Sequence, residues 1–196
     1  MTNTTARTEN RERRRTTAGG VLVAATVAMG LIAGSFYVFA CAVMPALARS
    51  DDRVYVEVMQ NTDDAIYNPV FFLSFMGALV LTAISAWQLR SSRRLRRWVW
   101  AALVAYALAF LFTVTVNVPL NTDLVDAGDP ARIADPAAVR EEFEDPWVAW
   151  NVVRAVLSTC ALGFLAWALV LYGRYGPYGR QASAYLESAA GSSASR

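Results

Sequence analysis

The 196-residue chain contains no histidine and no lysine, and it has only two cysteines. Without histidine, the chain cannot form His-ligated haem or metal sites, and it cannot use Ser-His or Cys-His pairs for nucleophilic catalysis. Two cysteines are too few for a Cys-rich zinc or iron–sulfur site. The sequence therefore predicts no metal and no cofactor. All 18 basic residues are arginine, which is typical of a GC-rich bacterial genome.

Charged residues are also scarce, at 17% of the chain, whereas 56% of the residues are hydrophobic. Four stretches hold no charged residue: 16–48, 65–89, 98–122 and 155–173. Each is close to or above the roughly 20 residues that a helix needs to cross a bilayer. The pattern predicts an all-α integral membrane four-helix bundle with a long acidic outer loop. The membrane domain is expected over 19–175, with spans near 21–45, 69–89, 98–121 and 146–173.

Arginine and acidic residues are distributed unequally between the segments that flank these stretches. The first, third and fifth segments together hold 13 Arg and 3 acidic residues, whereas the second and fourth hold 5 Arg and 13 acidic residues. Because basic residues stay inside, this predicts a multi-pass cell-membrane protein with both termini in the cytoplasm. The polar ends, 1–18 and 176–196, are expected to be disordered cytoplasmic tails, the first of them basic. The lipid bilayer is the expected partner, no nucleic-acid partner is expected, and the oligomeric state stays open.

Prolines mark the expected helix ends. Asn68-Pro69 and Asp145-Pro146 each combine a good N-cap with proline at the first helical position, so they are predicted to begin the second and fourth spans. The first span is expected to end near Pro45. Apolar residues at helical spacing over 52–67 predict a further helix on the outer rim, and a short helix is expected over 135–143.

Polar residues inside the third stretch gather near its outer end. Asn117 and Asn121 are four residues apart and therefore share one face of a helix. Pro119 lies between them and cannot donate a hydrogen bond to the carbonyl of Thr115. We therefore expect a kink that exposes a backbone acceptor.

A second polar stripe opens the fourth span, where Trp147, Asn151 and Arg154 recur at helical spacing. Arg154 lies about 12 Å of helical rise beyond the predicted helix start, so it is too deep to be casually exposed and needs a partner. The candidate partners are Asn117, Asn121, the Thr115 carbonyl, Gln60, Asn68 and the carboxylates of Glu57, Asp63, Asp64 and Asp123. One interpretation is a network that locks the helix ends together. The other is a small polar pocket in which Arg154 and the asparagine amides hold an anionic or carbonyl oxygen.

The two cysteines, Cys41 and Cys160, both lie near the predicted outer surface. A disulfide between the first and fourth spans is therefore geometrically conceivable. Buried, inert thiols are the favoured interpretation, because cysteine often fills small apolar sites in packed interiors.

Several short motifs follow one another in the chain: Met44-Pro45-Ala46-Leu47, Met59-Gln60, Tyr67-Asn68-Pro69, Asn117-Val118-Pro119-Leu120-Asn121 and Trp147-x-x-Trp150-Asn151-x-x-Arg154. Over residues 30–173, this series resembles the anthrone oxygenase-like family, a four-span membrane domain. Fungal members of that family oxidise an anthrone to an anthraquinone without a recognised cofactor. The resemblance implies the same fold and an expected cofactor-free oxygenation of an aromatic polyketide or quinol-type substrate.

The implied chemistry needs an enolate-stabilising group, aromatic walls and a base. The resemblance implies a catalytic set of Arg154, Asn117 and Asn121, and a substrate-binding set of Trp147, Trp150, Asn151, Gln60 and Asn68. These residues are expected to hold a planar aromatic small molecule in an outward-facing pocket. The base is expected among the carboxylates of the acidic loops or at Tyr67, without a single favoured residue. The alternative is a non-enzymatic membrane protein that binds a small molecule or lipid, or assists the assembly of a complex.

Cysteine labelling tests the predicted orientation. A membrane-impermeant thiol reagent added from outside should label Asp129→Cys, because that position lies in the acidic segment expected outside. The same reagent should leave Arg93→Cys unlabelled, because that position lies in an arginine-rich segment expected inside. Labelling of Arg93→Cys alone would reverse the orientation.

Overall fold

A computed structural model describes the backbone of residues 2–175 and the side chains of residues 16–175. This part of the chain is helical and contains no strand. The elements are α1 (Thr2–Val38), η1 (Phe39–Val43), α2 (Met44–Leu47), α3 (Asp52–Ile66), α4 (Pro69–Gln88), α5 (Arg93–Phe112), η2 (Thr113–Asn117), α6 (Val118–Asp126) and α7 (Pro136–Tyr175). Four helical stretches within it, 16–47, 69–88, 93–126 and 136–175, are long and apolar enough to cross a membrane. The predicted all-α fold with four spans is confirmed.

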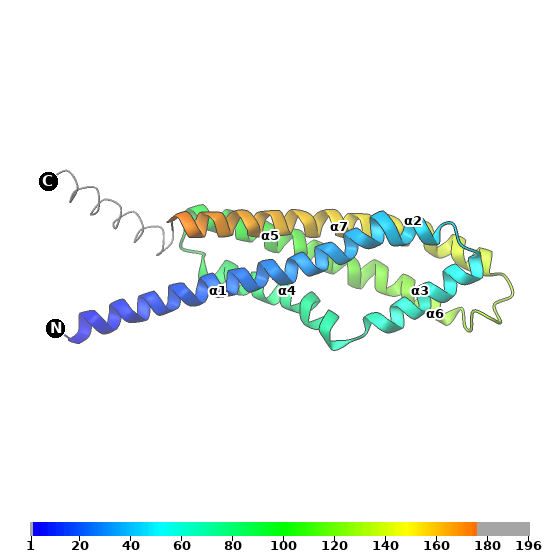
Figure 1. The fold of residues 1–196 in the computed structure, drawn as a ribbon, viewed down its shortest axis with the longest axis horizontal. Helices are drawn as coiled ribbons and strands as arrows, with labels where there is room; N and C mark the ends of the chain where they lie inside the picture. The colour runs from blue at the N-terminus through cyan, green and yellow to red at the C-terminus, as the bar shows by residue number, and fades with distance from the viewer. Residues whose placement is uncertain (1, 176–196) are drawn as a thin grey trace, which may run out of the picture.

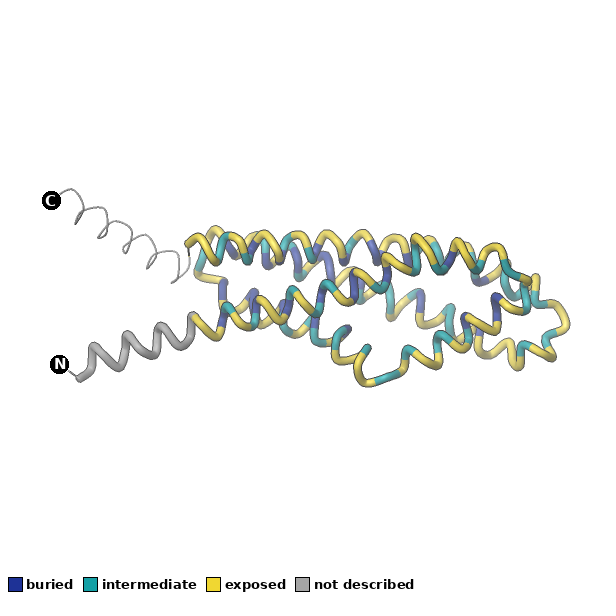
Figure 2. The backbone as a smooth tube through the Cα atoms, viewed as in Figure 1, coloured by how far each residue is buried: buried dark blue, intermediate teal, exposed yellow. Residues whose placement is uncertain are grey.

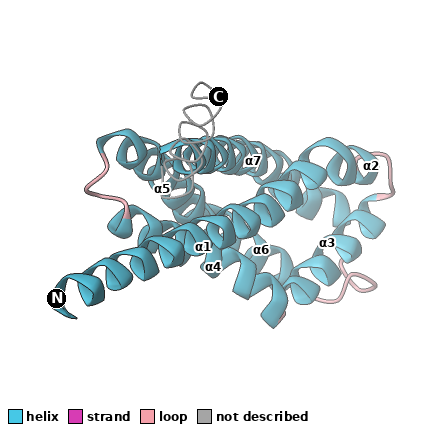
Figure 3. Ribbon diagram, turned by 60° about the vertical axis from the view of Figure 1, so that its left-hand side comes forward, coloured by secondary structure: helices cyan, strands magenta, loops and turns pink. Residues whose placement is uncertain are grey.

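The four long helices form a closed ring. α1 packs against α4 and α7, and α5 also packs against α4 and α7 (Figure 1). The C-terminal end of α7, at Tyr175, lies at one end of this ring (Figure 1). At the opposite end, α2, α3, α6 and the first turns of α7 form a second layer, which we call the cap (Figure 3). The molecule is therefore a membrane bundle that carries a helical cap on one end.

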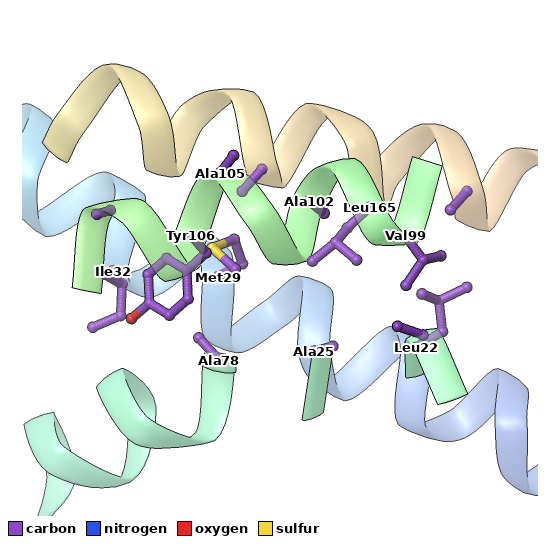
Figure 4. Packing of buried hydrophobic residues seen from close by; sticks show 14 of the residues in the cluster. Leu22, Ala25, Met29, Ile32, Ala78, Val99, Ala102, Ala105, Tyr106 and Leu165 are labelled. Carbon is purple, nitrogen blue, oxygen red and sulfur yellow. The ribbon is translucent and has the colours of Figure 1, made fainter. Parts of the chain in front are cut away.

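Small side chains let the bundle helices approach closely. Ala25 of α1, Ala78 of α4 and Ala102 of α5 are fully buried and face one another's helices (Figure 4). Small residues at such contacts favour helix association in lipid, where the hydrophobic effect between helices is weak. The buried Tyr106 hydroxyl donates a hydrogen bond of 2.9 Å to the carbonyl of Phe75, so its polar end is also satisfied. The bundle core is thus closely packed.

The cap has a separate hydrophobic core. Its buried residues come from α2, α3, α6 and α7, and the buried faces of these segments turn inward (Figure 2). The cluster consists of Met44, Tyr55, Val56, Met59, Leu124, Phe143 and Trp147. The predicted rim helix over 52–67 corresponds to α3, which Asp51 caps by accepting a hydrogen bond of 3.0 Å from the amide of Arg53. Because α3 buries one face, it is part of the folded domain.

Of the two helix starts predicted from proline, the one at Asn68-Pro69 is correct and the one at Asp145-Pro146 is wrong. Asn68 caps α4 and accepts hydrogen bonds from the amides of Val70 and Phe71 at 3.1 and 2.9 Å. Asp145-Pro146 does not begin the fourth span, because α7 starts at Pro136 and continues through Pro146. The segment expected as a long acidic outer loop is consequently mostly helix.

Packing on both sides of Pro146 keeps α7 continuous. Phe143 and Trp147 flank the proline, lie one turn apart and are both buried in the cap core. Their rings stack with centroids 6.0 Å apart. Pro146 removes one backbone hydrogen bond, but these two anchors hold the helix on one axis across the missing bond.

The N-terminal end also differs from expectation. Residues 1–18 were expected to form a disordered tail, whereas α1 begins at Thr2. No proline or glycine lies between Thr2 and Ala18, so the helix of the first span can continue toward the N-terminus without a new nucleation step. The expected tail 176–196 lies outside the described residues.

Arg140 ties three segments of the cap together. Its Nε donates a hydrogen bond of 2.6 Å to Glu144, and its Nη1 donates one of 2.9 Å to Asp52. The same guanidinium donates to the carbonyls of Ser50 and Ala48, both at 3.1 Å. With its side chain only 14% exposed, Arg140 links α7 to the turn that joins α2 and α3.

Replacement of Arg140 should therefore destabilise the cap. We expect Arg140→Gln to lower the free energy of unfolding by about 1–3 kcal/mol, because it leaves two backbone carbonyls and two carboxylates without their charged donor. Arg132→Gln is the matched control, since the Arg132 side chain is 86% exposed and pairs only with Asp129 at 3.4 Å. Its effect should stay within about 0.5 kcal/mol. Denaturant unfolding in detergent measures both, and equal effects would contradict the role of Arg140.

Candidate functional site

A cavity of about 120 Å³ lies between the bundle core and the cap core. It receives side chains from every span and from α3. Its lining residues are Ser35, Phe36, Phe39, Met59, Thr62, Asp63, Ile66, Tyr67, Phe71, Phe72, Phe75, Thr113, Asn117, Val118, Asn121, Trp147, Asn151 and Arg154. Most of the wall is apolar, and a few polar groups converge on it, which is typical of small-molecule sites.

Two π-helical turns shape this cavity. η1 and η2 each hold five residues, and each is followed within two positions by a proline, Pro45 and Pro119. Proline has no N–H to donate to the carbonyl four residues before it, so the preceding residue donates to the carbonyl five residues back. Thus the amide of Val118 bonds to the carbonyl of Thr113. The irregularity expected at Pro119 is therefore a π-helical turn. Its residues Thr113 and Asn117 line the cavity.

Arg154 of α7 lines the cavity and is only 5% exposed. Its Nη2 donates a hydrogen bond of 3.1 Å to the Asn151 side-chain oxygen, and its Nη1 reaches the Thr113 hydroxyl at 3.5 Å. Its Nε has no partner, and no carboxylate of the described residues forms an ion pair with it. The guanidinium carbon is 4.5 Å from the ring centroid of Phe36 and 5.5 Å from that of Trp147. The charge is thus held by amide, hydroxyl and aromatic groups without a counter-ion.

Asn117 and Asn151, the two buried asparagines that line the cavity, differ in their hydrogen bonding. Asn151 is fully used, because its amide nitrogen donates to the Phe36 carbonyl at 3.2 Å while its oxygen accepts from Arg154. Asn117 is 1% exposed, yet neither its nitrogen nor its oxygen has a protein partner. A buried amide without partners is costly, and both Asn117 and Arg154 line the cavity.

Asp63, Asn121 and Trp147 form a hydrogen-bonded chain along the cavity wall. The Trp147 indole N–H donates to the Asn121 oxygen at 2.8 Å, and the Asn121 nitrogen donates to Asp63 at 2.6 Å. Burial raises the pKa of the Asp63 carboxyl above its usual range, the bond from Asn121 opposes that rise, and nearby Asp64 adds to it. Asp63 and Arg154 therefore lie at opposite ends of one chain of contacts that passes through Asn121 and Trp147.

Five of the eight predicted site residues line the cavity: Asn117, Asn121, Trp147, Asn151 and Arg154. Three others lie elsewhere. The Trp150 ring packs against Phe112, with centroids 4.7 Å apart. Gln60 donates to the carbonyls of Leu124 and Gly128 at 2.7 and 3.1 Å and so anchors the end of α6. Asn68 serves as the N-cap of α4.

The connections between the third and fourth spans differ in detail from expectation. Asn117 and Asn121 were candidate partners for Arg154, but neither bonds directly to Arg154 or Asn151. Asn121 instead accepts from Trp147, while Arg154 reaches Thr113. The π-helical turn η2 explains this difference in partners. Its extra residue rotates the side chains that follow it around the helix axis by part of a turn, relative to a regular α-helix.

Several lining residues escaped sequence analysis. Phe36, Phe39 and Thr113 sit in apolar stretches where no pattern separates them from ordinary span residues. Asp63 was named only as one of several carboxylates that could partner Arg154, although it had a usable signal: it continues the spacing of Val56 and Met59 on the buried face of α3, whereas Asp64 is exposed. Cys41 and Cys160 are free and exposed, so the expected burial of the thiols is wrong.

The fold and the cavity define a four-span helical membrane protein with an aromatic-walled polar site. A family model described as "Anthrone oxygenase" matches residues 71–166. No curated protein and no solved structure matches the chain. The chain therefore carries an anthrone oxygenase family domain, as its motifs indicated. The matched region includes the five predicted residues that line the cavity, whereas α3 and Asp63 precede it.

The contrast between the two asparagines gives a stability test. We expect Asn117→Leu to maintain or raise the thermal stability of the ligand-free protein, because it removes two buried polar groups that no protein atom satisfies. Asn151→Leu should instead cost about 1–3 kcal/mol, since it deprives the Phe36 carbonyl and Arg154 of their partner. Thermal unfolding of both variants in the same detergent measures the difference. A loss in Asn117→Leu as large as that in Asn151→Leu would contradict a free Asn117 amide.

Proposed function

We propose that this protein is a cofactor-free oxygenase that converts a planar aromatic ketone with an acidic C–H bond, of the anthrone type, into a quinone. One observation carries the proposal: among the residues that the structure describes, Arg154 is a buried cation without a counter-ion, in an aromatic-walled cavity that also contains one carboxylate. A substrate that becomes an anion when it is bound would supply the missing charge. The anthrone oxygenase family domain supports the same reaction class.

Arg154 and Asn117 are the proposed oxyanion-binding groups. The Nε of Arg154 and the amide nitrogen of Asn117 are donors without protein partners. Donors that are already oriented toward a developing oxyanion stabilise it without reorganisation, and the effect is larger where water is excluded. The rings of Phe36 and Trp147 lie beside the guanidinium and offer flat surfaces for an aromatic substrate.

Asp63 is the proposed general base. Among the described residues it is the one carboxylate that lines the cavity. Its raised pKa makes the ionised form a stronger proton acceptor than an exposed aspartate. The bond from Asn121, which Trp147 in turn holds, fixes its orientation. Tyr67, the other sequence candidate for a base, also lines the cavity but is exposed.

The proposed reaction proceeds in balanced steps. Asp63 removes a proton from the carbon that lies across the ring from the carbonyl, and the electron pair moves onto the carbonyl oxygen, where Arg154 and Asn117 hold it. The enolate gives one electron to dioxygen, and the resulting radical and superoxide join at that carbon to form a peroxide. Asp63 returns its proton to the peroxide, and loss of water leaves a second carbonyl. One dioxygen is consumed and one water is released for each substrate oxidised.

The orientation that the arginine distribution predicts belongs to this proposal. With both termini in the cytoplasm, the cap and the cavity lie at the outer side of the cell membrane. The substrate would then be oxidised at that side, where dioxygen, which is soluble in the bilayer, is readily available.

Oxygen uptake by the purified protein in lipid nanodiscs, with an anthrone as substrate, tests this function. Asp63→Asn keeps the shape and a hydrogen-bond acceptor but removes the base, so we expect kcat to fall by about 10²–10⁴-fold. Asp64→Asn is the matched control, since Asp64 is the exposed neighbour, and it should retain activity. For the wild type, kcat/KM should rise with pH through the raised pKa of Asp63, because only the ionised carboxylate accepts the proton.

Two results would contradict the proposal. Full activity of Asp63→Asn would exclude Asp63 as the base. Retention of the anthrone without oxygen uptake by the wild type would favour a binding protein, which is the alternative that the sequence left open.

A further inference from the structure

The cavity is closed along the bundle axis in both directions. Toward the bundle, its floor includes Phe36 and Phe75, which are both buried in the bundle core. Toward the cap, its roof includes Met59 and Trp147, which are both buried in the cap core. A ligand that came from the water above the cap would have to pass through a packed hydrophobic cluster.

The side of the cavity is different, because three lining residues there are exposed. Tyr67 and Phe72 lie on either side of the turn between α3 and α4, and their ring centroids are 6.0 Å apart. Val118 lies at the start of α6, next to Asn117. Figure 1 shows that α3 and α4 meet at an angle, with the elbow pointing away from the bundle. We call the surface formed by Tyr67, Phe72 and Val118, where lining residues of the cavity are exposed, the side portal.

The length of α4 places the side portal at the edge of the hydrocarbon layer. α4 has 20 residues, which at 1.5 Å rise span about 30 Å, the thickness of that layer. Phe72 is in the first turn of α4, so it lies at the edge of the layer. The neighbouring surface is apolar as well, since Val70, Leu73 and Val114 are all exposed. Such a surface is suited to lipid rather than to water.

The size of the cavity also requires an opening for a flat polycycle. An engineered protein cavity of about 150 Å³ accommodates a single benzene ring, and this cavity has about 120 Å³. A substrate of three fused rings would therefore place one ring beside Arg154 and extend the others toward Tyr67 and Phe72.

We propose that the ligand, a flat lipophilic aromatic with an ionisable oxygen, enters the cavity sideways from the bilayer through the side portal and keeps part of its ring system there. This inference rests on the proposed function for the class of ligand. It revises the expectation of an outward-facing pocket, because the route runs from lipid rather than from the outer water.

Val118→Phe tests the portal, with Val114→Phe as the matched control. Both residues are exposed valines about one turn apart, but only Val118 lines the cavity. The probe is 2-hydroxyanthraquinone, which is already fully oxidised and cannot turn over. Its association with the protein in nanodiscs is followed by quenching of tryptophan fluorescence in a stopped-flow instrument. Val118→Phe should slow association by about tenfold, because an added ring overfills a tight passage, while Val114→Phe should match the wild type.

Spin labels report which solvent faces the portal. In a Cys41→Ala, Cys160→Ala background, a nitroxide on Val118→Cys should collide more often with oxygen, which concentrates in lipid, than with a water-soluble nickel chelate. Addition of 2-hydroxyanthraquinone should reduce the mobility of this label and leave a label on Val114→Cys unchanged.

The outcomes separate the portal from the function. Binding of the quinone with equal association rates in both phenylalanine variants, or preferential collision of the Val118 label with the nickel chelate, would overturn the side portal alone. Absence of quinone binding by the wild type would overturn both the proposed function and the portal.

Discussion

The buried charge of Arg154 is the constraint on which the site depends. An unpaired cation in a region of low dielectric costs several kcal/mol, and proteins normally offset this with a carboxylate. Here the compensation is partial: an amide from Asn151, a hydroxyl from Thr113 and two aromatic faces. In the proposed function, a substrate oxyanion would supply the charge that Arg154 lacks, so the feature that weakens the empty fold would strengthen the bound state.

Other parts of the structure keep Arg154 apart from the cavity carboxylate. Two proline-linked π turns open the bundle wall, and the cap core closes the space above it. The bonds between Asp63, Asn121 and Trp147 keep the carboxylate at a distance from the guanidinium. If Asp63 formed an ion pair with Arg154, both charges would be neutralised and neither would be available to a substrate.

Much of the fold and part of the site could be predicted from sequence, for identifiable reasons. Stretches without charge reveal spans because lipid excludes charge, and Asn68-Pro69 reveals a helix start because both residues act locally. Asp145-Pro146 misled because the anchors Phe143 and Trp147, which keep α7 continuous, act through tertiary packing. Sequence spacing could not show that the Trp150 ring packs against Phe112, because Phe112 lies on another span and the contact is tertiary.

The most direct test of the account is the phenol pKa of bound 2-hydroxyanthraquinone, measured from its visible absorption in nanodiscs. Wild-type protein should lower this pKa relative to protein-free lipid, because Arg154 and Asn117 stabilise the phenolate. Arg154→Lys, which keeps a charge but loses the planar fork, should lose most of the shift while the protein stays folded. An unchanged pKa in the wild type, or an equal shift in Arg154→Lys, would contradict the claim that the guanidinium of Arg154 binds the oxygen of the substrate.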